Sequence, residues 1–260
     1  MPSLPIYVTL IQSDIVWEDK QTNLEQYQQL IARTTTVRHV VVLPEMFSTG
    51  FSMSPELLAE PMDGPTIGWM KKIASQHRCI LTGSLIIEDN GKYYNRMLWV
   101  QPDGKVAHYD KRHLFGFASE DHHYASGTSR VITQVNGWRF NLMVCYDLRF
   151  PVWSRNQGEE YDVLIYVANW PEQRSMAWKT LLQARAIENQ CYVIGVNRIG
   201  KDPKGNNYSG DSSVFGPSGE TLWQQSHSQD VHTVALNAEV LTKVRQNYPF
   251  LKDADTFLML

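Results

Sequence analysis

Residues 141–151 have the sequence Asn-Leu-Met-Val-Cys-Tyr-Asp-Leu-Arg-Phe-Pro, in which a short apolar strand leads into a tight turn at Cys145. A nucleophile at such a strand-to-helix turn is exposed, and the backbone N–H groups that follow it point toward any oxyanion formed beside it. Free cysteine is also among the most buried residue types, so a core position explains this segment equally well by itself. The segment indicates an α/β protein with Cys145 as a candidate nucleophile.

Strands and helices alternate on both sides of this segment. From apolar runs and helical spacing we expect strands at 5–12, 39–43, 79–87, 93–101, 131–135, 138–144, 161–168 and 191–196, and helices at 19–33, 66–77 and 173–190. Turn-forming sequences at 89–92, 102–105 and 136–137 predict hairpins. Two α/β halves favour two sheets packed face to face with helices outside, a four-layer α-β-β-α sandwich. A single open doubly wound sheet is the competing architecture. No linker or repeat interrupts the pattern, so residues 1–260 are predicted to form one domain.

The composition is that of an ordinary globular protein, with 43% hydrophobic and 20% charged residues among 260. The formal net charge is −3, and acidic and basic residues are mixed along the chain. This argues against a nucleic-acid partner, which requires a concentrated basic surface. The apolar runs are too short to span a bilayer, and the N-terminus lacks the basic and apolar regions of a signal peptide. We therefore expect neither a membrane nor a nucleic-acid partner.

Cysteine usage is consistent with a reducing compartment. The three cysteines, Cys79, Cys145 and Cys191, are odd in number and widely spaced, which argues against a disulfide framework. Cys79 and Cys191 begin apolar strands and are predicted to be core residues. The pair His122-His123 resembles two metal ligands, but adjacent side chains diverge, and no Cys/His cluster has zinc spacing. We expect a cytoplasmic protein without a metal site.

Two charged residues elsewhere in the chain can complement the thiol of Cys145. Glu45 follows an apolar strand and a proline, which places it at the carboxyl edge of a sheet, and Lys111 lies in the aromatic-flanked sequence Tyr-Asp-Lys-Arg-His-Leu-Phe. Each could equally be a solvated surface residue. A thiol that hydrolyses an amide needs a base and a group that stabilises the oxyanion, and a carboxylate and an ammonium supply these. A cysteine–histidine dyad would serve as well, and spacing does not choose between the two schemes.

Three segments occur in an order that resembles the signature blocks of the nitrilase (carbon–nitrogen hydrolase) superfamily. They are Leu-Pro-Glu-Met-Phe-Ser-Thr-Gly-Phe at 43–51, Tyr-Asp-Lys-Arg-His-Leu-Phe at 109–115 and Val-Cys-Tyr-Asp-Leu-Arg-Phe-Pro at 144–151. The similarity extends along nearly the whole chain, including residues 182–190 and 210–219. The resemblance implies a four-layer sandwich, usually dimeric or larger, with a Glu-Lys-Cys triad and with no metal or organic cofactor.

Matched residue by residue, the resemblance assigns roles to five positions. Glu45 corresponds to the general base, Lys111 to the ammonium beside the oxyanion and Cys145 to the nucleophile. The family often has a second glutamate that positions the lysine and the substrate amide, and Glu120 is the best match. The backbone N–H of Tyr146 is then expected to be the second oxyanion donor.

The segments Cys-Tyr-Asp-Leu-Arg-Phe-Pro at 145–151 and Ala-Asn-Trp-Pro at 168–171 resemble the omega-amidase branch, which deamidates 2-oxoglutaramate and 2-oxosuccinamate to oxo-diacids and ammonia. Such substrates carry a carboxylate far from the amide. Arg149 lies about one helical turn after the nucleophile and could bind this carboxylate through two hydrogen bonds. The alternative is a structural ion pair between Arg149 and Asp147 or Glu188.

Aromatic crowding near the predicted site favours a small substrate. Phe117, Trp170 and Met143 are candidates for the pocket walls, and Arg174 could lie at the pocket mouth. For Trp170 and Met143 a core position is an equally good interpretation. By family expectation, the C-terminal tail at 247–260 is a possible homodimer contact.

Two other functions remain open at this stage. The chain could be a hydrolase of the same superfamily that acts on a nitrile, a carbamoyl amine or an acylated peptide. It could also be a non-catalytic binding protein on the same fold, although the complete Glu-Lys-Cys set argues against this.

Overall fold

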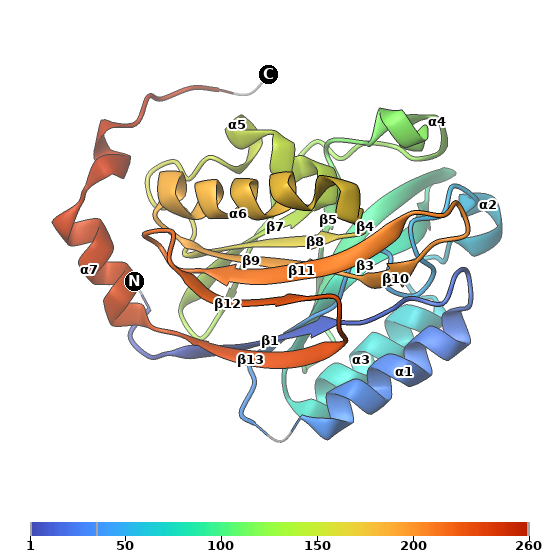
Figure 1. Ribbon diagram of the computed structural model, residues 1–260. Helices are drawn as coiled ribbons and strands as arrows, with labels where there is room; N and C mark the ends of the chain where they lie inside the picture. The colour runs from blue at the N-terminus through green and yellow to red at the C-terminus, as the bar shows by residue number, and fades with distance from the viewer. Residues whose placement is uncertain (1, 35, 259–260) are drawn as a thin grey trace.

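The computed structural model describes residues 2–34 and 36–258. Two β-sheets lie face to face between layers of helices (Figure 1). This confirms the predicted four-layer α-β-β-α sandwich and excludes the single open sheet. Of the tail predicted at 247–260, the last two residues lie outside the described part of the chain.

The first sheet has six strands in the order β13-β1-β2-β3-β4-β5. β1, β2 and β3 run parallel, while the β3–β4, β4–β5 and β1–β13 pairs are antiparallel. The strand bounds are β1 Ile6–Gln12, β2 Val40–Val42, β3 Ile80–Asp89, β4 Lys92–Val100, β5 Val106–Asp110 and β13 Asp230–Leu236. The predicted turns at 89–92 and 102–105 connect β3 to β4 and β4 to β5.

The second sheet has seven strands, six in the order β10-β11-β9-β8-β7-β6, with β12 paired to β11. β7, β8 and β9 are parallel, so their carboxyl ends lie on the same edge. The strand bounds are β6 Ile132–Val135, β7 Trp138–Val144, β8 Val163–Ala168, β9 Tyr192–Asn197, β10 Ile199–Lys201, β11 Asn207–Phe215 and β12 Thr221–Ser226. The predicted Asn136-Gly137 hairpin joins β6 to β7, and both residues have positive φ, as a type I′ turn requires.

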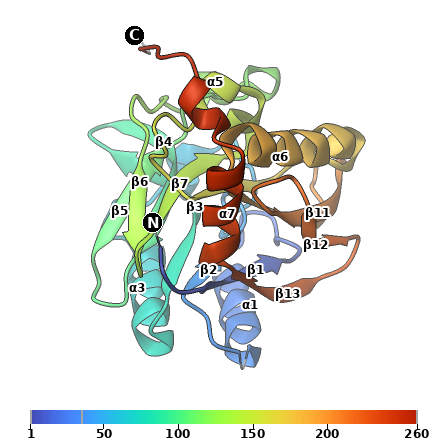
Figure 2. The same ribbon diagram turned by 90° about the vertical axis from the view of Figure 1, so that its left-hand side faces the viewer.

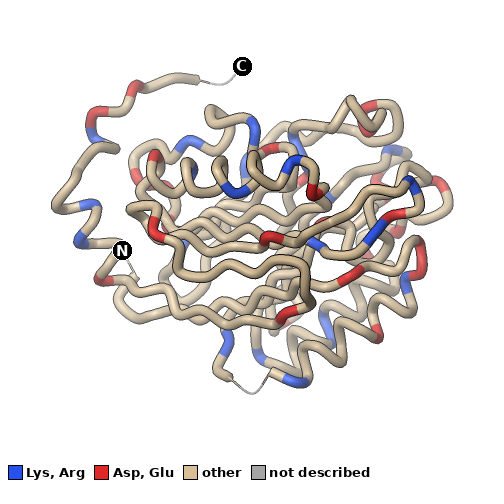
Figure 3. Tube along the Cα trace, in the orientation of Figure 1, with Lys and Arg blue, Asp and Glu red and all other residues tan. Residues whose placement is uncertain are grey.

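The helices form the outer layers. α1 and α3 lie on one side of the molecule and α6 on the other, with the sheets between them (Figures 1 and 2). Acidic and basic residues are interspersed along the whole trace (Figure 3). The helix bounds are α1 Lys20–Arg33, α2 Pro55–Leu58, α3 Pro65–His77, α4 Glu120–His123, α5 Pro151–Ser154, α6 Ser175–Asn189 and α7 Ala238–Asn247, and the 3-10 turns are η1 Gly116–Ala118, η2 Cys145–Arg149, η3 Glu172–Arg174 and η4 Phe250–Asp253.

Side chains that alternate between the two faces of a strand contribute to two different apolar layers. On β4, Met97 and Trp99 pack in the core that contains the second sheet, whereas Leu98 and Val100 pack against the side chains of α1 and α3. This is the period-two pattern of a strand that is buried on both faces. Among the residues that the structure describes, none of the helices combines the length and apolar character that a bilayer crossing requires.

Candidate active site

Four polar side chains follow directly from strand ends at one edge of the sandwich. Glu45 lies three residues beyond β2, Lys111 follows β5, Cys145 follows β7 and Asn169 follows β8. Neighbouring parallel strands deliver their carboxyl ends to the same edge, which is where ligands bind in α/β proteins. The fold therefore brings together residues that are far apart in the sequence.

Cys145 begins the 3-10 turn η2 directly after β7, as the sequence predicts. Its φ angle is 45°, in the left-handed region that a residue with a side chain rarely occupies. Such backbone strain is typical of functional turns, where the surrounding structure holds the residue in place. Cys145 is a free cysteine and is half-buried as a residue, whereas Cys79 and Cys191 are buried, as predicted.

Hydrogen bonds from β3 hold the segment that carries Glu45. The N–H of Leu43 donates to the carbonyl of Thr82, and the N–H of Met46 donates to the hydroxyl of Ser84. The side chain of Glu45 is fully buried, which contradicts the alternative of a solvated loop glutamate.

Glu45, Lys111 and Glu120 form a buried ionic cluster. The Lys111 Nζ atom lies 3.0 Å from Glu45 Oε1, 3.0 Å from Glu120 Oε1 and 2.8 Å from Glu120 Oε2. None of the three side chains is exposed to solvent. The structure thus brings Glu120, on the short helix α4, to the lysine beside Glu45.

The two glutamates accept further hydrogen bonds from uncharged groups. The backbone N–H of Asn169 donates to Glu45 Oε2 at 2.7 Å, and the N–H of Phe115 donates to Glu120 Oε2 at 2.6 Å. The side-chain amide of Asn95 donates to Oε1 of Glu45 at 2.8 Å and of Glu120 at 3.1 Å. Asn95 and Asn169 were missed by the sequence analysis, although each is a polar residue within or directly after an apolar strand.

The pKa values in the cluster follow from burial and neighbouring charge. Burial lowers the pKa of Lys111, but the carboxylates of Glu120 and Glu45 outweigh it and raise that pKa above its ordinary value. Burial raises the pKa of Glu120, and the ammonium of Lys111 opposes this rise. Burial, together with the charge of Glu45, raises the pKa of the Cys145 thiol well above its usual value. These shifts favour the ammonium form of Lys111 and the thiol form of Cys145.

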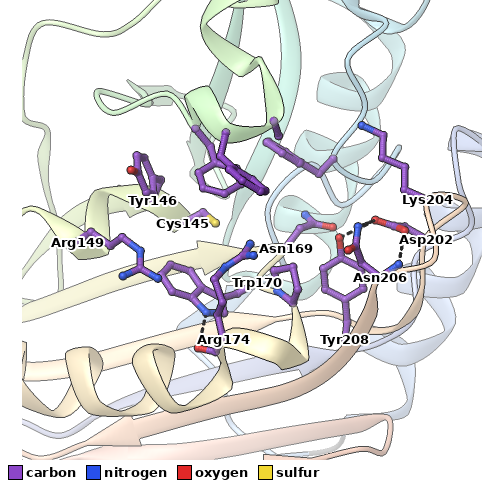
Figure 4. A pocket seen from close by; sticks show the side chains of 15 residues that line it. Cys145, Tyr146, Arg149, Asn169, Trp170, Arg174, Asp202, Lys204, Asn206 and Tyr208 are labelled. Carbon is purple, nitrogen blue, oxygen red and sulfur yellow. Dashed lines mark hydrogen bonds between the residues drawn. The ribbon is translucent and has the colours of Figure 1, made fainter.

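A cavity of about 230 Å³ opens above Cys145. Figure 4 shows Cys145, Tyr146 and Arg149 at one end and Asp202, Lys204 and Asn206 at the other. Its lining combines aromatic side chains with three cationic ones and comprises Phe51, Phe115, Phe117, Ala118, Cys145, Tyr146, Arg149, Asn169, Trp170, Pro171, Arg174, Asp202, Lys204, Asn206 and Tyr208. All five residues predicted to contact substrate (Tyr146, Arg149, Phe117, Trp170 and Arg174) are in this lining.

Two arginines reach the cavity by lying over aromatic rings. The Cζ atom of Arg149 lies 4.9 Å from the ring centroid of Trp170, and that of Arg174 lies 5.3 Å from the centroid of Phe115. The indole N–H of Trp170 donates to the carbonyl of Arg174 at 2.8 Å. Stacking of this kind orients a guanidinium without using its N–H donors.

The structure does not contain the ion pairs that were the alternative for Arg149. Asp147 contacts His113 at 2.8 Å, and Glu188 contacts Arg185 at 2.9 Å. Within the described ranges neither carboxylate pairs with Arg149. The prediction that Met143 forms a wall of the cavity was wrong, because this residue is fully buried in the core. It pairs with Tyr166, on the face of the second sheet that packs against α6.

The loop between β5 and β6 contains the adjacent histidines His122 and His123. His122 and His123 are exposed on α4. Residues 2–34 and 36–258 contain no group of three or more His, Cys, Asp or Glu residues arranged to hold a metal ion.

Comparison with known proteins finds similarity over nearly the whole chain. Residues 7–246 match the carbon-nitrogen hydrolase family. The chain is 44% identical to "Omega-amidase YafV" of Escherichia coli K12, over 99% of both chains, and 30% identical to the "2-oxoglutaramate amidase" of Bacillus subtilis, over 95% of this chain and 96% of the relative. A solved CN-hydrolase superfamily protein from Xanthomonas campestris, 39% identical, covers 99% of this chain with all of its own length and a TM-score of 0.97. With the fold, the sequence and the residues around Cys145 in agreement, the chain belongs to the carbon-nitrogen hydrolase family.

Proposed function

We propose that this protein is an omega-amidase, which hydrolyses the terminal amide of 2-oxoglutaramate or 2-oxosuccinamate to the oxo-diacid and ammonia. The observation that carries the proposal is a single cavity that contains both the thiol of Cys145 and the guanidinium of Arg149, which forms no ion pair with any described residue. The thiol suits an amide carbon, and the guanidinium suits a carboxylate at the far end of a short substrate. The omega-amidase and 2-oxoglutaramate amidase relatives support this assignment.

In the proposed mechanism Glu45 accepts the proton of Cys145 as the sulfur attacks the amide carbon. The ammonium of Lys111 and the N–H of Tyr146 stabilise the oxyanion of the tetrahedral intermediate. Glu45 then returns the proton to the nitrogen, the C–N bond breaks and ammonia leaves. Lys111 is an unsuitable proton donor in this step, because its neighbouring carboxylates hold its proton tightly.

The second half of the reaction hydrolyses the thioester. Glu45 activates a water molecule that has entered in place of ammonia, and the water attacks the acyl carbon. The resulting intermediate uses the same oxyanion donors, and its collapse regenerates the thiol. Glu120 positions Lys111 throughout, since it contacts the Nζ atom with both carboxylate oxygens.

The walls of the cavity support a small anionic substrate. Arg149 and Arg174 present guanidinium groups, and Phe117 and Trp170 provide apolar surface beside them. Phe117 is 89% exposed at the rim, whereas Trp170 is almost fully buried. Arg149 is assigned to bind the substrate carboxylate, and Arg174 is assigned to the mouth of the cavity.

Ammonia release tests the proposal directly. Purified wild type and Cys145→Ala are compared on 2-oxoglutaramate, glutamine, asparagine and a simple nitrile, with Cys191→Ala as the matched control. We expect release from 2-oxoglutaramate by the wild type and Cys191→Ala, and none by a folded Cys145→Ala. Release from the nitrile instead would assign the site to another substrate of the family. A folded wild type inert toward all four, with no acyl adduct at Cys145 by mass spectrometry, would favour a binding protein.

We also propose that the protein is a cytoplasmic homodimer. The free cysteines fit a reducing compartment. Large apolar side chains are exposed near the C-terminus and on α5, namely Tyr248, Phe250 and Val152. Light scattering gives the mass of the particle, and a monomer across the micromolar range would contradict the homodimer.

A further inference from the structure

Asn95 lies between the two glutamates of the ionic cluster. It is fully buried on β4, and its Nδ2 atom donates to Oε1 of Glu45 at 2.8 Å and to Oε1 of Glu120 at 3.1 Å. Its backbone carbonyl accepts a hydrogen bond from the N–H of Lys111 at 3.0 Å. One residue therefore contacts all three charged members of the cluster.

The neighbours of Asn95 determine the orientation of its amide group. In the opposite orientation the side-chain oxygen would face two carboxylate oxygens, and this arrangement is repulsive. In the observed orientation the Oδ1 atom is buried and has no hydrogen-bond partner among the described residues. An unpaired buried carbonyl destabilises a protein, and such a group calls for an explanation when it occurs in a native structure. The two donor contacts of Nδ2 supply that explanation.

Charge balance in the cluster indicates what these donor contacts achieve. Two carboxyl groups face one ammonium in a site that excludes solvent, so full ionisation of both leaves one negative charge without a counter-charge. Besides Lys111, each glutamate receives one backbone N–H, from Asn169 or from Phe115. Asn95 is the uncharged side chain that donates to both carboxylates. A neutral donor favours the ionised form of an acid without adding a charge that would compete for Lys111.

We propose that Asn95 is a positioning residue, which keeps Glu45 and Glu120 ionised together and holds Glu45 ready to accept the proton of Cys145. Its side-chain N–H groups are directed at the two glutamates, so it acts through them rather than on the substrate. The inference rests on the proposed role of Glu45 as the general base. On this inference the side-chain amide of Asn95 contributes, through Glu45, to the activation of Cys145.

The test replaces Asn95 by leucine, which has a similar volume and no donor. Without the two N–H groups the carboxylates hold protons more tightly, so the acidic limb of the kcat/KM profile for 2-oxoglutaramate should move to higher pH by about one unit. At neutral pH we expect kcat to fall roughly 10- to 100-fold with little change in KM, because the substrate contacts remain. Asn95→Ser, which keeps one donor, should lie between wild type and Asn95→Leu, and it replaces the leucine variant if that one does not fold.

Asn141→Leu is the matched control. Asn141 is also fully buried on a strand, and neither polar atom of its side chain has a partner within the described chain. This variant should leave the acidic limb in place. An equal shift in both variants, or a loss of activity in the Asn95 variants without a shift, would reduce Asn95 to a packing residue and overturn the proposal.

A measurement without substrate separates this inference from the proposed function. The rate at which iodoacetamide alkylates Cys145 is measured as a function of pH, with Cys145→Ala as the blank. If ionised Glu45 removes the thiol proton, this rate has an acidic limb, which should move to higher pH in Asn95→Leu. If the limb moves while the wild type releases no ammonia from 2-oxoglutaramate, the substrate assignment fails and the role of Asn95 stands. A limb that does not move overturns the role of Asn95, whatever the substrate.

Discussion

The hydroxyl of Tyr109 donates a hydrogen bond to the carboxylate of Asp147 at 2.8 Å, and this contact joins β5 of the first sheet to the turn η2 that follows β7 of the second. The same carboxylate accepts from the backbone N–H of His113 at 3.0 Å and contacts its Nδ1 atom at 2.8 Å. It also accepts from the backbone N–H of Val144 at 3.0 Å. Lys111 lies between Tyr109 and His113 in the sequence. The buried carboxylate of Asp147 therefore connects the segment that carries Lys111 to the strand end that carries Cys145.

Asp147→Asn should therefore impair both stability and catalysis. The asparagine keeps one acceptor but presents N–H groups to donors, and we expect a loss of about 2–3 kcal/mol in the free energy of unfolding. For a chain of this size that lowers the melting temperature by roughly 5–10 °C. Because the spacing of Lys111 and Cys145 changes, kcat should fall at temperatures where the variant is fully folded. Thermal unfolding followed by circular dichroism and steady-state assays on 2-oxoglutaramate measure the two effects.

Asp162→Asn is the control for this variant. Asp162 is fully buried and contacts Arg139 and Arg245 without contacting the site residues. It should lose stability and retain its kcat. If the two variants lose kcat equally while folded, Asp147 has no special role in spacing the catalytic groups.

Arg149→Met should weaken the binding of substrates that carry a carboxylate. Methionine can still pack on Trp170, but it offers no charge and no N–H donors. The loss of charge-assisted hydrogen bonds predicts a rise in KM for 2-oxoglutaramate of roughly 10- to 100-fold. Arg174→Met should have a smaller effect, since we place it at the mouth.

A neutral amide of similar size, such as butyramide, is the internal control for the arginine variants. It lacks the carboxylate, so Arg149→Met should leave its kcat/KM within a factor of about three of the wild type. Equal losses on both substrates would show that Arg149 supports the shape of the site rather than the substrate charge.

The sequence predicted the elements that depend on local pattern. Apolar runs located β1–β4 and β6–β9 but not β5 or β10–β13, and Asn136-Gly137 located the turn between β6 and β7. Glu45 could be named because it follows such a strand, and Lys111 because aromatic residues flank its charged segment, but their proximity to Cys145 came from the resemblance. Periodicity carries no information on which strand ends meet.

The contacts that the sequence could not reveal join residues distant along the chain. Asn95 contacts Glu45 across 50 positions, and Asn169 contacts it across 124. A polar residue in an apolar strand suggests a buried partner but does not identify it. Asn141 on β7 shows that such a residue can also lack a hydrogen-bond partner among the described residues. Asp147 was considered only as a partner for Arg149, because the fold that brings it to Tyr109 is not visible in one segment.

Glu45→Gln should separate the ionisation of Cys145 from turnover. Apart from burial, the negative charge of Glu45 raises the pKa of the thiol, whereas Lys111 lowers it. Removal of the carboxylate charge therefore moves the thiol pKa downward, and the thiolate forms at lower pH than in the wild type. Turnover should nevertheless fall by about 100-fold or more, because no base remains to deliver the proton to ammonia or to activate water.

The ultraviolet absorbance of the thiolate, with the absorbance of Cys145→Ala subtracted, gives the midpoint of the Cys145 titration in the wild type and in Glu45→Gln. A matched variant is Glu60→Gln, since Glu60 is also buried and pairs with Lys20 away from the site. It should leave the midpoint unchanged. A midpoint that rises in Glu45→Gln would contradict the arrangement of charges described for the cluster.

Cys191→Val should reduce the loss of stability at alkaline pH. Burial raises the pKa of the Cys191 thiol far above its ordinary value, so the folded protein retains a proton that the unfolded chain releases above about pH 8.5. The stability from this raised pKa is fully present below the unfolded pKa and is lost as pH rises. Between about pH 8 and pH 10 the loss from one such thiol is roughly 2 kcal/mol, and valine removes it. Urea unfolding at both pH values measures the difference, in which any packing effect of valine cancels. An equal decline in wild type and Cys191→Val would show that the thiol ionises as readily in the folded core as in the unfolded chain.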